Sequence, residues 1–349
     1  MRTLLALLKR LWAQLRHEVF VLPSRSFVLL GAIVLVLLPL AWGDAYVLRI
    51  VTMTAIFAIF AASWDLLSGF TGQINFGHAL FFGVGAYTSA LLSHHFGLPP
   101  WFTMPIGALM AMVSGVLVGI PCLRLRGSYL SLATLAFPLI LVGILFAFPD
   151  FSGGELGISG LRRVVASPVA NYYVAVLLMM ALCMTMWKIG TSRMGLIFHA
   201  IREDEVACRA SGINTPRYKL IAFALSGLFA GVAGALFAHF MRVAGPSSLE
   251  VALSFQAVIW GVFGGAATIY GAVVAVFVLY PLTEVLANFE LFREIRTLTS
   301  AVIILLVLLF MPQGMAPWIR DKIENVCPRC KARNVVGRHQ CRLCSAELD

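Results

Sequence analysis

The sequence predicts an all-α polytopic membrane protein with about ten transmembrane helices, some of them broken, and a small C-terminal zinc ribbon. Hydrophobic residues make up 60% of the 349 residues and charged residues only 12%, against about 25% charged in an ordinary soluble domain. Long apolar runs recur along most of the chain, and two CxxC pairs stand near its end. A chain of this length has room for about ten spans of about 20 residues, and for no separate soluble domain of ordinary size.

The first 26 residues carry five basic side chains against one acidic side chain, Glu18. The apolar residues that share one helical face of this arm are Leu4, Leu8, Leu11, Leu15 and Val19. This pattern predicts a basic amphipathic helix that lies on the membrane surface. A disordered basic arm is the alternative, whereas a cleaved signal peptide is disfavoured because no small-residue cleavage site follows the arm.

Apolar runs with few or no charges predict the spans. Seven of them cover residues 27–42, 46–64, 78–92, 101–122, 129–148, 169–187 and 220–241. Residues 251–283 form a run of 33 residues without a charge, which as one helix would be about 50 Å long in a hydrocarbon core of about 30 Å. Its centre reads GVFGGAATIYG from Gly261 to Gly271, so we expect two short helices broken at the glycines. A last span at 298–311 brings the count to ten.

An even number of spans places both termini on the same side of the membrane. Four basic segments then share that side, namely the N-terminal arm, Arg124 with Arg126, residues 188–219, and the tail after Trp318. These segments hold 20 of the 26 lysines and arginines, so the positive-inside rule places both termini in the cytoplasm of a bacterial inner membrane. The net charge of +10 then reflects topology, and no nucleic-acid partner is needed to explain it. If residues 251–283 cross only once, or one half merely dips into the membrane, the tail moves to the outer side.

Three regions follow from this reading: a basic arm at 1–26, a transmembrane domain at 27–319 and a cytoplasmic tail at 320–349. The tail has the spacing CxxC, ten residues, CxxC, with Cys327, Cys330, Cys341 and Cys344. Four thiolates at this spacing predict a closed structural zinc site. Disulfides or free thiols are the alternatives, and His339 is a less favoured replacement ligand. Basic residues around the ribbon are also suited to contact anionic lipid headgroups.

Two stretches depart from a plain hydrophobic span. In the first, Asp65, Gln73, Asn75 and His78 stand among glycines between residues 63 and 92. Polar side chains at membrane depth are costly and usually face a pathway or pair internally, so this stretch is either a broken segment that lines a solute path or a loop with ordinary capping residues. In the second, a charged helix-like segment ends at Gly212 between two spans. It is either a docking element for a soluble partner or a solvated connection.

The second stretch continues into a span with the small residues Gly227 and Gly231 four positions apart. This spacing predicts close packing of that helix against a neighbour.

Several motifs in combination resemble one family. They are DLLSGFTGQINFGHALFFGVGAY, LRLRGSYLSLATLAF, GGELGI from Gly153, AIREDEVACRASGINTPRYKLIAFALSGLFAGVAGAL, GVFGGAATIYGA and FMPQGM. The chain resembles the LivM-type permease subunits of branched-chain amino acid ABC transporters, over about residues 63–315. The resemblance implies that the segment from Arg202 to Gly212 is the coupling helix that docks into the ATPase, with Glu203, Asp204 and Glu205 at the joint. It also implies two ATPase subunits, a second related permease and an extracytoplasmic solute-binding protein as partners.

The candidate solute path consists of Gln73, Asn75, His78 and Thr134. Pro138, Ala266 and Ala272 depart from the family pattern, so urea or another small solute is the alternative cargo. The chain contains no GxxxxGK[ST] motif, so it has no phosphate-binding loop and ATP would be bound only by the partner subunits. The histidines are dispersed and form no catalytic constellation, so we expect no enzyme. A secondary transporter is the remaining alternative, since it also uses broken helices and polar groups within the membrane.

Overall fold

The computed structural model describes residues 23–41, 43–125, 127–286 and 313–330, together with 302, 305, 309, 311, 333–335, 340, 341, 344, 346 and 347. The predicted amphipathic helix therefore lies outside the described residues over 1–22, as does most of the predicted span at 298–311. The described part of the chain is mainly helical, as predicted. The longer helices of the bundle are α2 (Pro23–Ala41), α3 (Ala45–Trp64), α4 (Ala79–Phe96), α5 (Pro100–Cys122), α6 (Ser128–Ala147), α8 (Pro168–Thr191) and α11 (Thr215–Met241).

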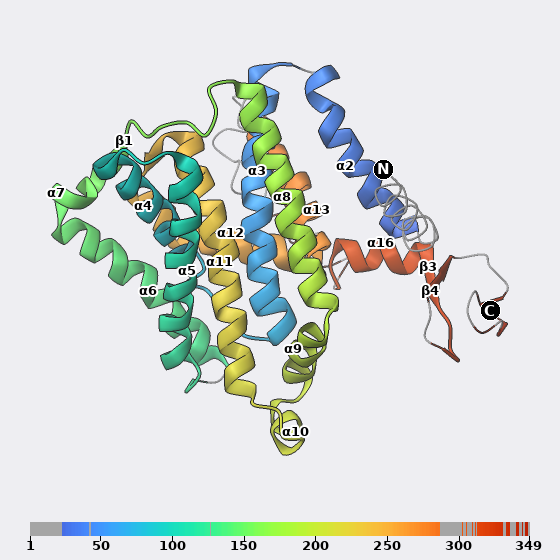
Figure 1. Cartoon of the computed structure of the whole chain (residues 1–349). Helices are drawn as coiled ribbons and strands as arrows, with labels where there is room; N and C mark the ends of the chain where they lie inside the picture. The colour runs from blue at the N-terminus through green and yellow to red at the C-terminus, as the bar shows by residue number, and fades with distance from the viewer. Residues whose placement is uncertain are drawn as a thin grey trace, which may run out of the picture.

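Shorter elements join these helices. They are η1 (Asp65–Gly69), α7 (Pro149–Ser152), η2 (Gly154–Leu156), β1 (Ile158–Ser159), α9 (Arg193–Glu203), α10 (Glu205–Ala210), β2 (Val243–Ala244), η3 (Pro246–Leu249), α12 (Val251–Gly264), α13 (Tyr270–Leu286), α16 (Met315–Ile323), β3 (Glu324–Val326) and β4 (Arg333–Val335). Helices α9 and α10 lie at one end of the bundle, and α7 with β1 lies at the other (Figure 1). At that second end β1 pairs antiparallel with β2.

Five helices of the described residues are long and apolar enough to cross a membrane. They are Ala45–Gly69, Pro100–Cys122, Ser128–Ala147, Pro168–Thr191 and Thr215–Met241, and each confirms a predicted span. Three shorter apolar helices cover Leu29–Leu40, Val251–Gly264 and Tyr270–Leu286. The count of ten spans therefore stays a prediction.

Helix α3 is the central element of the bundle. It continues through the π-helical turn η1, and 72% of its most apolar 18-residue stretch is buried, against 22% of the corresponding stretch of α6. The ring of Phe57 on α3 has neighbours from several helices, with centroids 5.5 Å from Trp260 and 5.1 Å from Tyr280. Helix α6 instead exposes most of its apolar side chains, as expected for a surface that meets lipid or another membrane chain.

Small residues allow α4, α5 and α11 to pack with their backbones in contact. A Cβ added at Gly85 of α4 would stand 2.2 Å from the carbonyl oxygen of Gly231. A Cβ at Gly227 of α11 would stand 2.5 Å from the carbonyl oxygen of Ala111 on α5. The prediction that Gly227 and Gly231 serve close helix packing is confirmed, because no larger residue fits at either position without moving a backbone.

The long uncharged run is broken where the glycines predict it. Helix α12 ends at Gly264 and α13 begins at Tyr270, with Gly265 between them at φ +106°. With 14 and 17 residues, the helices are about 21 and 26 Å long, each shorter than a hydrocarbon core of about 30 Å. The prediction of two short helices is confirmed, whereas the number of times they cross the membrane stays a prediction.

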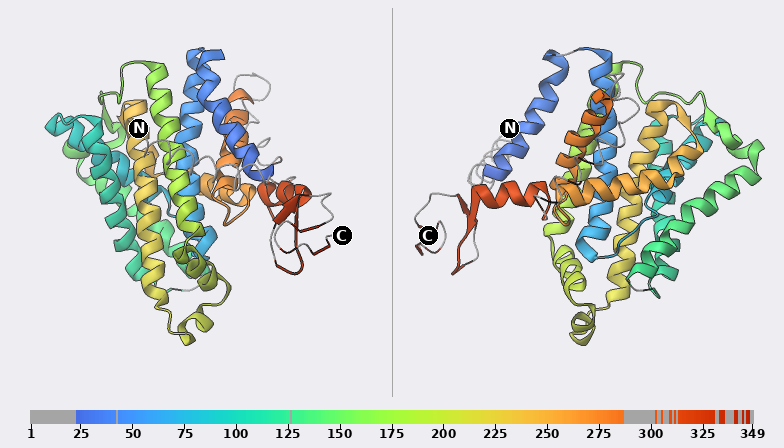
Figure 2. Two further views of the ribbon diagram at one scale, coloured as in Figure 1. Left: turned by 45° about the vertical axis from the view of Figure 1, so that its right-hand side comes forward. Right: turned by 180° about the vertical axis from the view of Figure 1, so that it is seen from behind.

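Helix α16 carries the end of the chain away from the bundle to the hairpin of β3 and β4 (Figure 2). Before it leaves, α16 packs on the break between α12 and α13. A Cβ at Gly265 would stand 2.4 Å from Cδ of Pro317, and Arg320 donates a hydrogen bond from Nη1 to the hydroxyl of Tyr270 at 3.4 Å. The tail is therefore anchored on the bundle through α16.

Candidate functional site

The charged segment between α8 and α11 forms two short helices, as its pattern predicts. Asp204 separates α9 from α10, and its Oδ1 accepts the backbone N–H groups of Val206 at 2.8 Å and Ala207 at 3.0 Å. This side chain is therefore the N-cap of α10. Gly212, at φ +81°, follows the end of α10 in a conformation that favours glycine. We call α9 and α10 together the α9–α10 hairpin.

Glu205 holds this hairpin to the first turns of α11. Its Oε2 accepts a hydrogen bond from Nζ of Lys219 at 2.6 Å, and its Oε1 accepts bonds from Arg209 and, at 3.2 Å, from Thr215. The side chain of Lys219 is only 7% exposed and that of Glu205 23%. Burial alone would raise the pKa of Glu205, but the bonds from Lys219 and Arg209 outweigh burial and lower this pKa below its ordinary value.

The outer surface of the hairpin combines charged and apolar side chains. Glu203 and Asp204 are exposed, and so are Val206 at 69% and Leu196 at 66%. Sequence reasoning singled out the charged residues and missed these two apolar ones. Val206 directly follows the charged run from Arg202 to Glu205, which was the available signal, whereas Leu196 lies in an apolar run that gave none.

Arg202 contacts the bundle rather than solvent alone. Its Nη1 donates a hydrogen bond of 2.6 Å to the carbonyl oxygen of Gly69, the last residue of η1. Next to this contact, the ring of Phe70 packs on His199 of α9 with centroids 4.7 Å apart. Burial lowers the pKa of His199, and the neighbouring Arg202 charge lowers it further. The hairpin is thus joined to the C-terminal end of the central helix.

Residues 72–78 follow η1 without forming a helix, and three of them, Asn75, Gly77 and His78, are buried. Side chains of neighbouring elements satisfy its backbone. Nε1 of Trp64 donates to the carbonyl oxygen of Asn75 at 2.8 Å, and the N–H of Phe76 donates to Oγ1 of Thr134 at 3.1 Å. Irregular backbone at membrane depth needs such partners, because lipid offers none.

Three of the four predicted path residues are buried in this segment and its surroundings. Asn75, His78 and Thr134 are each at most 1% exposed, whereas Gln73 is half-buried. The hydroxyl of Ser63 donates to a backbone carbonyl, so Nε2 of His78, 2.9 Å from Ser63 Oγ, is the donor in that contact. The structure therefore brings Asn75, His78 and Thr134 together as supports of the irregular segment, while the exposed Ile74 beside Gln73 faces outward.

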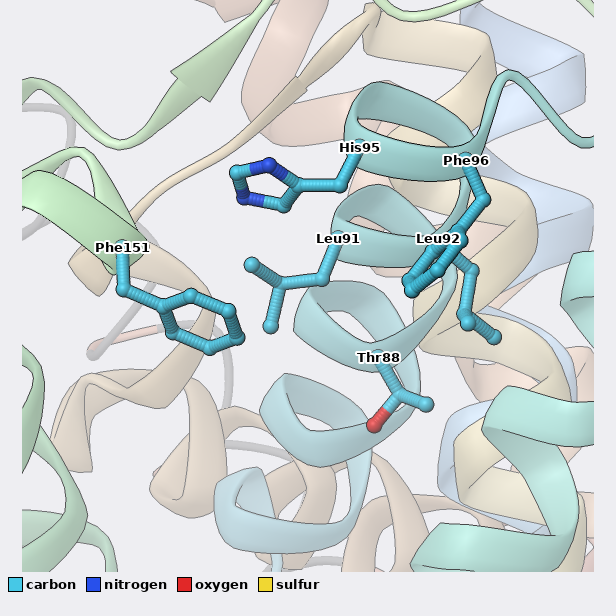
Figure 3. Close-up of a pocket in the computed structure, with 6 residues that line it drawn as sticks. All are labelled: Thr88, Leu91, Leu92, His95, Phe96 and Phe151. Atoms are coloured by element: carbon cyan, nitrogen blue, oxygen red, sulfur yellow. The ribbon is translucent and has the colours of Figure 1, made fainter.

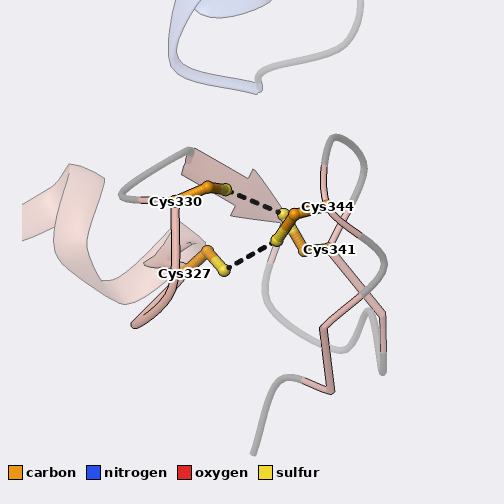
Figure 4. Close-up of side chains that lie close together, drawn as sticks. All are labelled: Cys327, Cys330, Cys341 and Cys344. Atoms are coloured by element: carbon orange, nitrogen blue, oxygen red, sulfur yellow. Dashed lines mark hydrogen bonds between the residues drawn. The ribbon is translucent and has the colours of Figure 1, made fainter.

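The tail brings its four cysteine sulfurs together. All four Sγ atoms lie within 4.8 Å of one another, and Figure 4 shows the pairs Cys327 with Cys344 at 3.6 Å and Cys330 with Cys341 at 3.5 Å. These distances exclude disulfides, which need about 2.05 Å, and match the roughly 3.8 Å between thiolates that share a tetrahedral zinc at about 2.3 Å. A hydrogen bond from the Cys330 backbone lowers the pKa of the Cys327 thiol. The four residues can therefore hold a metal ion.

Two cavities adjoin the described bundle. A groove of about 320 Å³ at the end opposite the hairpin is bounded by apolar side chains, with the ring of His95 stacked at 5.4 Å on Phe151 (Figure 3). A smaller pocket of about 140 Å³ lies between Phe70, His199, Thr268 and Arg320, where the hairpin, the helix break and α16 meet. The groove has no charged lining group, and the pocket pairs no carboxylate with a nucleophile.

The sequence comparisons identify the family. Residues 46–311 match the family model described as branched-chain amino acid transport system / permease component. This chain belongs to that family. The permease is 31% identical to the high-affinity branched-chain amino acid transport system permease protein LivM of Escherichia coli K12, with 84% of this chain and 76% of that protein aligned. It is 31% identical to LivM of Salmonella typhimurium, over 79% and 71% of the two chains.

The permease is also 26% identical to the LivH permease protein of Escherichia coli K12, over 79% of this chain and 95% of that one. No solved structure matches the chain. Membership in this family makes the protein a multi-pass inner-membrane permease subunit of an ABC importer and not an enzyme. The chain is thus similar to both LivM and LivH permease proteins of branched-chain amino acid transport systems.

Proposed function

We propose that this permease forms the translocation path for branched-chain amino acids. It couples to two separate ATPase subunits through the α9–α10 hairpin, which lies on the cytoplasmic side. One observation supports the coupling most directly. Val206 and Leu196 are 69% and 66% exposed on the hairpin, although its neighbouring Glu205 is engaged internally. These two side chains would be covered in a docked complex, in which the buried centre of an interface is more apolar than its rim.

Each of the five predicted coupling residues has a different role in this hairpin. Arg202 ties it to η1, Asp204 caps α10 and Glu205 holds α10 to α11. Gly212 allows the turn back into the membrane, and Glu203 remains exposed for the partner. The hairpin therefore moves as one body. An element that transmits movement from the ATPases to the membrane helices needs this rigidity.

The solute path runs along the exposed edge of the irregular segment. Gln73 is half-buried beside this edge, with its Oε1 buried and unpartnered among the described residues, and Asn75, Thr134 and His78 shape the backbone behind it. The rings of Phe76 and Phe255 lie beside it, tilted at 46° to each other with centroids 5.3 Å apart. An edge with one amide and aromatic faces suits a solute with an apolar side chain. Pro138 lies against Gly77 in this region, since a Cβ there would stand 3.3 Å from its Cδ, so cargo selection is open to the alternative of urea or another small solute.

The topology that supports this function has ten hydrophobic segments with both termini in the cytoplasm. Under it, the arm at 1–26 lies on the inner leaflet, the permease domain covers 27–319, and the tail covers 320–349. The excess of basic residues on one side supports this orientation. The tail binds a structural zinc through Cys327, Cys330, Cys341 and Cys344, which supplies the folding energy that so small a segment lacks.

The test uses the assembled transporter. The permease is co-expressed with the second permease and the two ATPases, reconstituted into liposomes containing ATP, and supplied with the extracytoplasmic binding protein. We expect uptake of leucine, isoleucine or valine that needs both ATP and the binding protein. Uptake of urea in their place would assign the alternative cargo. Uptake driven by an ion gradient without any ATPase would overturn the proposed function in favour of a secondary transporter.

A further inference from the structure

The carboxylate of Asp65 joins two helices that are far apart in sequence. It is fully buried in the first turn of η1. Its Oδ1 accepts the backbone N–H of Ala267 at 2.7 Å, and its Oδ2 accepts those of Thr268 and Ile269, each at 2.9 Å. These N–H groups lead directly into α13, so the carboxylate caps the positive end of that helix from a position on another helix.

The break between α12 and α13 has a backbone that needs outside support. Ala267 and Ile269 adopt φ values of +63° and +32°, which are unfavourable for residues with a side chain. Strained conformations of this kind persist only where the surroundings hold them. Here successive N–H groups converge on one carboxylate, a concave arrangement that favours an anion. Asp65 is therefore the group that holds the break in its shape.

The C-terminal end of η1 is in contact with the α9–α10 hairpin. Gly69 accepts the 2.6 Å bond from Arg202. A Cβ at Gly69 would stand 2.0 Å from Oδ1 of Asp65 and 2.6 Å from the backbone nitrogen of Ala267. Only glycine at this position leaves the break loop room to reach the carboxylate. One π-helical turn therefore contacts α9 through Gly69 and the break through both Gly69 and Asp65.

We propose that Asp65 is the positioning residue through which movement of the hairpin reaches the break between α12 and α13. A displacement of α9 acts on η1 through Arg202 and on the start of α13 through the Asp65 carboxylate. A π-helical turn is suited to this because it carries one residue more per hydrogen bond than the flanking α-helix and marks functional sites in other helices. The inference rests on the proposed function, in which the hairpin is the ATPase contact.

A purely structural cap makes a different prediction. If Asp65 only stabilises the fold, its replacement lowers stability but leaves the transport achieved per ATP unchanged. If it transmits movement, the complex assembles and hydrolyses ATP while transport per ATP falls. Asp65→Asn keeps the side-chain volume but replaces one accepting oxygen with an NH₂ group that faces an N–H donor. The variant therefore weakens the contact without opening a cavity.

The experiment measures solute transported per ATP hydrolysed by the reconstituted complex. We expect D65N to lower this ratio at least about tenfold, because charge-assisted bonds to buried N–H groups are among the strong ones. The matched control is D44N, the same substitution at the exposed N-cap of α3, which should leave the ratio unchanged. R202A should lower the ratio as well. The double variant D65N/R202A should be no worse than the more severe single variant, whereas D44N/R202A should show the R202A loss alone.

A D65N complex with the wild-type transport per ATP would overturn the inference. So would a D65N/R202A complex whose loss equals the product of the two single-variant losses. A second measurement needs no change at Asp65 and covers the case in which D65N does not assemble. Hydrogen exchange of the amides of Ala267, Thr268 and Ile269 should change when the wild-type complex binds ATP, and R202A should abolish that change. Constant exchange in the wild-type complex would overturn the inference. Failure of the ATPases to co-purify would instead contradict the proposed function itself.

Discussion

The pairing of Glu205 with Lys219 yields a stability prediction with a defined magnitude. In E205Q the ammonium group of Lys219, only 7% exposed, loses its carboxylate partner and faces a neutral amide. Breaking a buried pair by removing one partner costs about 3–5 kcal/mol, and we take about 2 kcal/mol here because Glu205 retains 23% exposure. This loss of stability is local and affects the junction between α10 and α11.

Hydrogen exchange of the solubilised permease measures this loss directly. A cost of about 2 kcal/mol raises the open population of the hairpin about thirtyfold, and the amides of residues 205–219 should exchange faster by that factor. The double variant E205Q/K219M removes both charges and should recover most of the protection, because a buried pair replaced as a whole is close to neutral. Protection in E205Q equal to wild type, or a double variant worse than E205Q, would refute the reasoning.

The same pair fixes a dependence on pH. The folded-state pKa of Glu205 is lower than its ordinary value, so its stabilisation is complete above the unfolded pKa of about 4.3. It is lost as pH falls through the folded pKa. The difference in melting temperature between wild type and E205Q should therefore be constant from about pH 6 to 8 and shrink below about pH 4. A difference that shrinks already between pH 6 and 8 would show that another group is responsible.

Three further predictions concern the interface, the bundle and the tail. V206D should reduce co-purification of the ATPases at least about tenfold while the melting temperature of the isolated permease stays within about 1 °C, because Val206 is 69% exposed; unchanged co-purification would remove it from the interface. G85V should lower stability by about 3 kcal/mol, the upper end of the usual cost of overpacking, because its Cβ would meet the Gly231 carbonyl at 2.2 Å. Wild-type stability would contradict the packing. C327S should reduce bound zinc, measured by mass spectrometry of the metal, to well below one ion per chain, with C183S, outside the cluster, as control.

The local features of this fold were predictable from the sequence. Spans follow from uncharged apolar runs, and five of them are confirmed because hydrophobicity is a property of each segment alone. The break at Gly265 follows from length and glycine content in the same way. The cysteine cluster was predictable because CxxC spacing sets ligand geometry locally, before any tertiary contact forms.

The partners of the buried polar groups could not be predicted. Asp65 lies 202 residues from Ala267, and nothing near either residue in sequence indicates the other. A polar residue in a span is equally consistent with a pathway and with an internal partner. Asp65 and His78 are buried and both have internal partners, whereas Gln73 is half-buried. Only the structure shows this difference. The hairpin shows the same limit, since its charge pattern pointed to Glu205, which is engaged internally, and away from Val206.

The end of the chain is more closely connected to the permease core than its sequence indicates. The family match stops at residue 311, and the tail beyond it has a composition unlike any span. Yet Pro317 contacts Gly265 and Arg320 contacts Tyr270, so α16 packs on the helix break that Asp65 also contacts. Helix α16 therefore packs as part of the bundle, although it lies beyond the end of the family match. A truncation that begins at Val326 removes the ribbon but keeps α16 on the helix break. A truncation that begins at Gly314 also removes α16 and exposes the break. Comparison of the two separates the effect of the ribbon from that of α16.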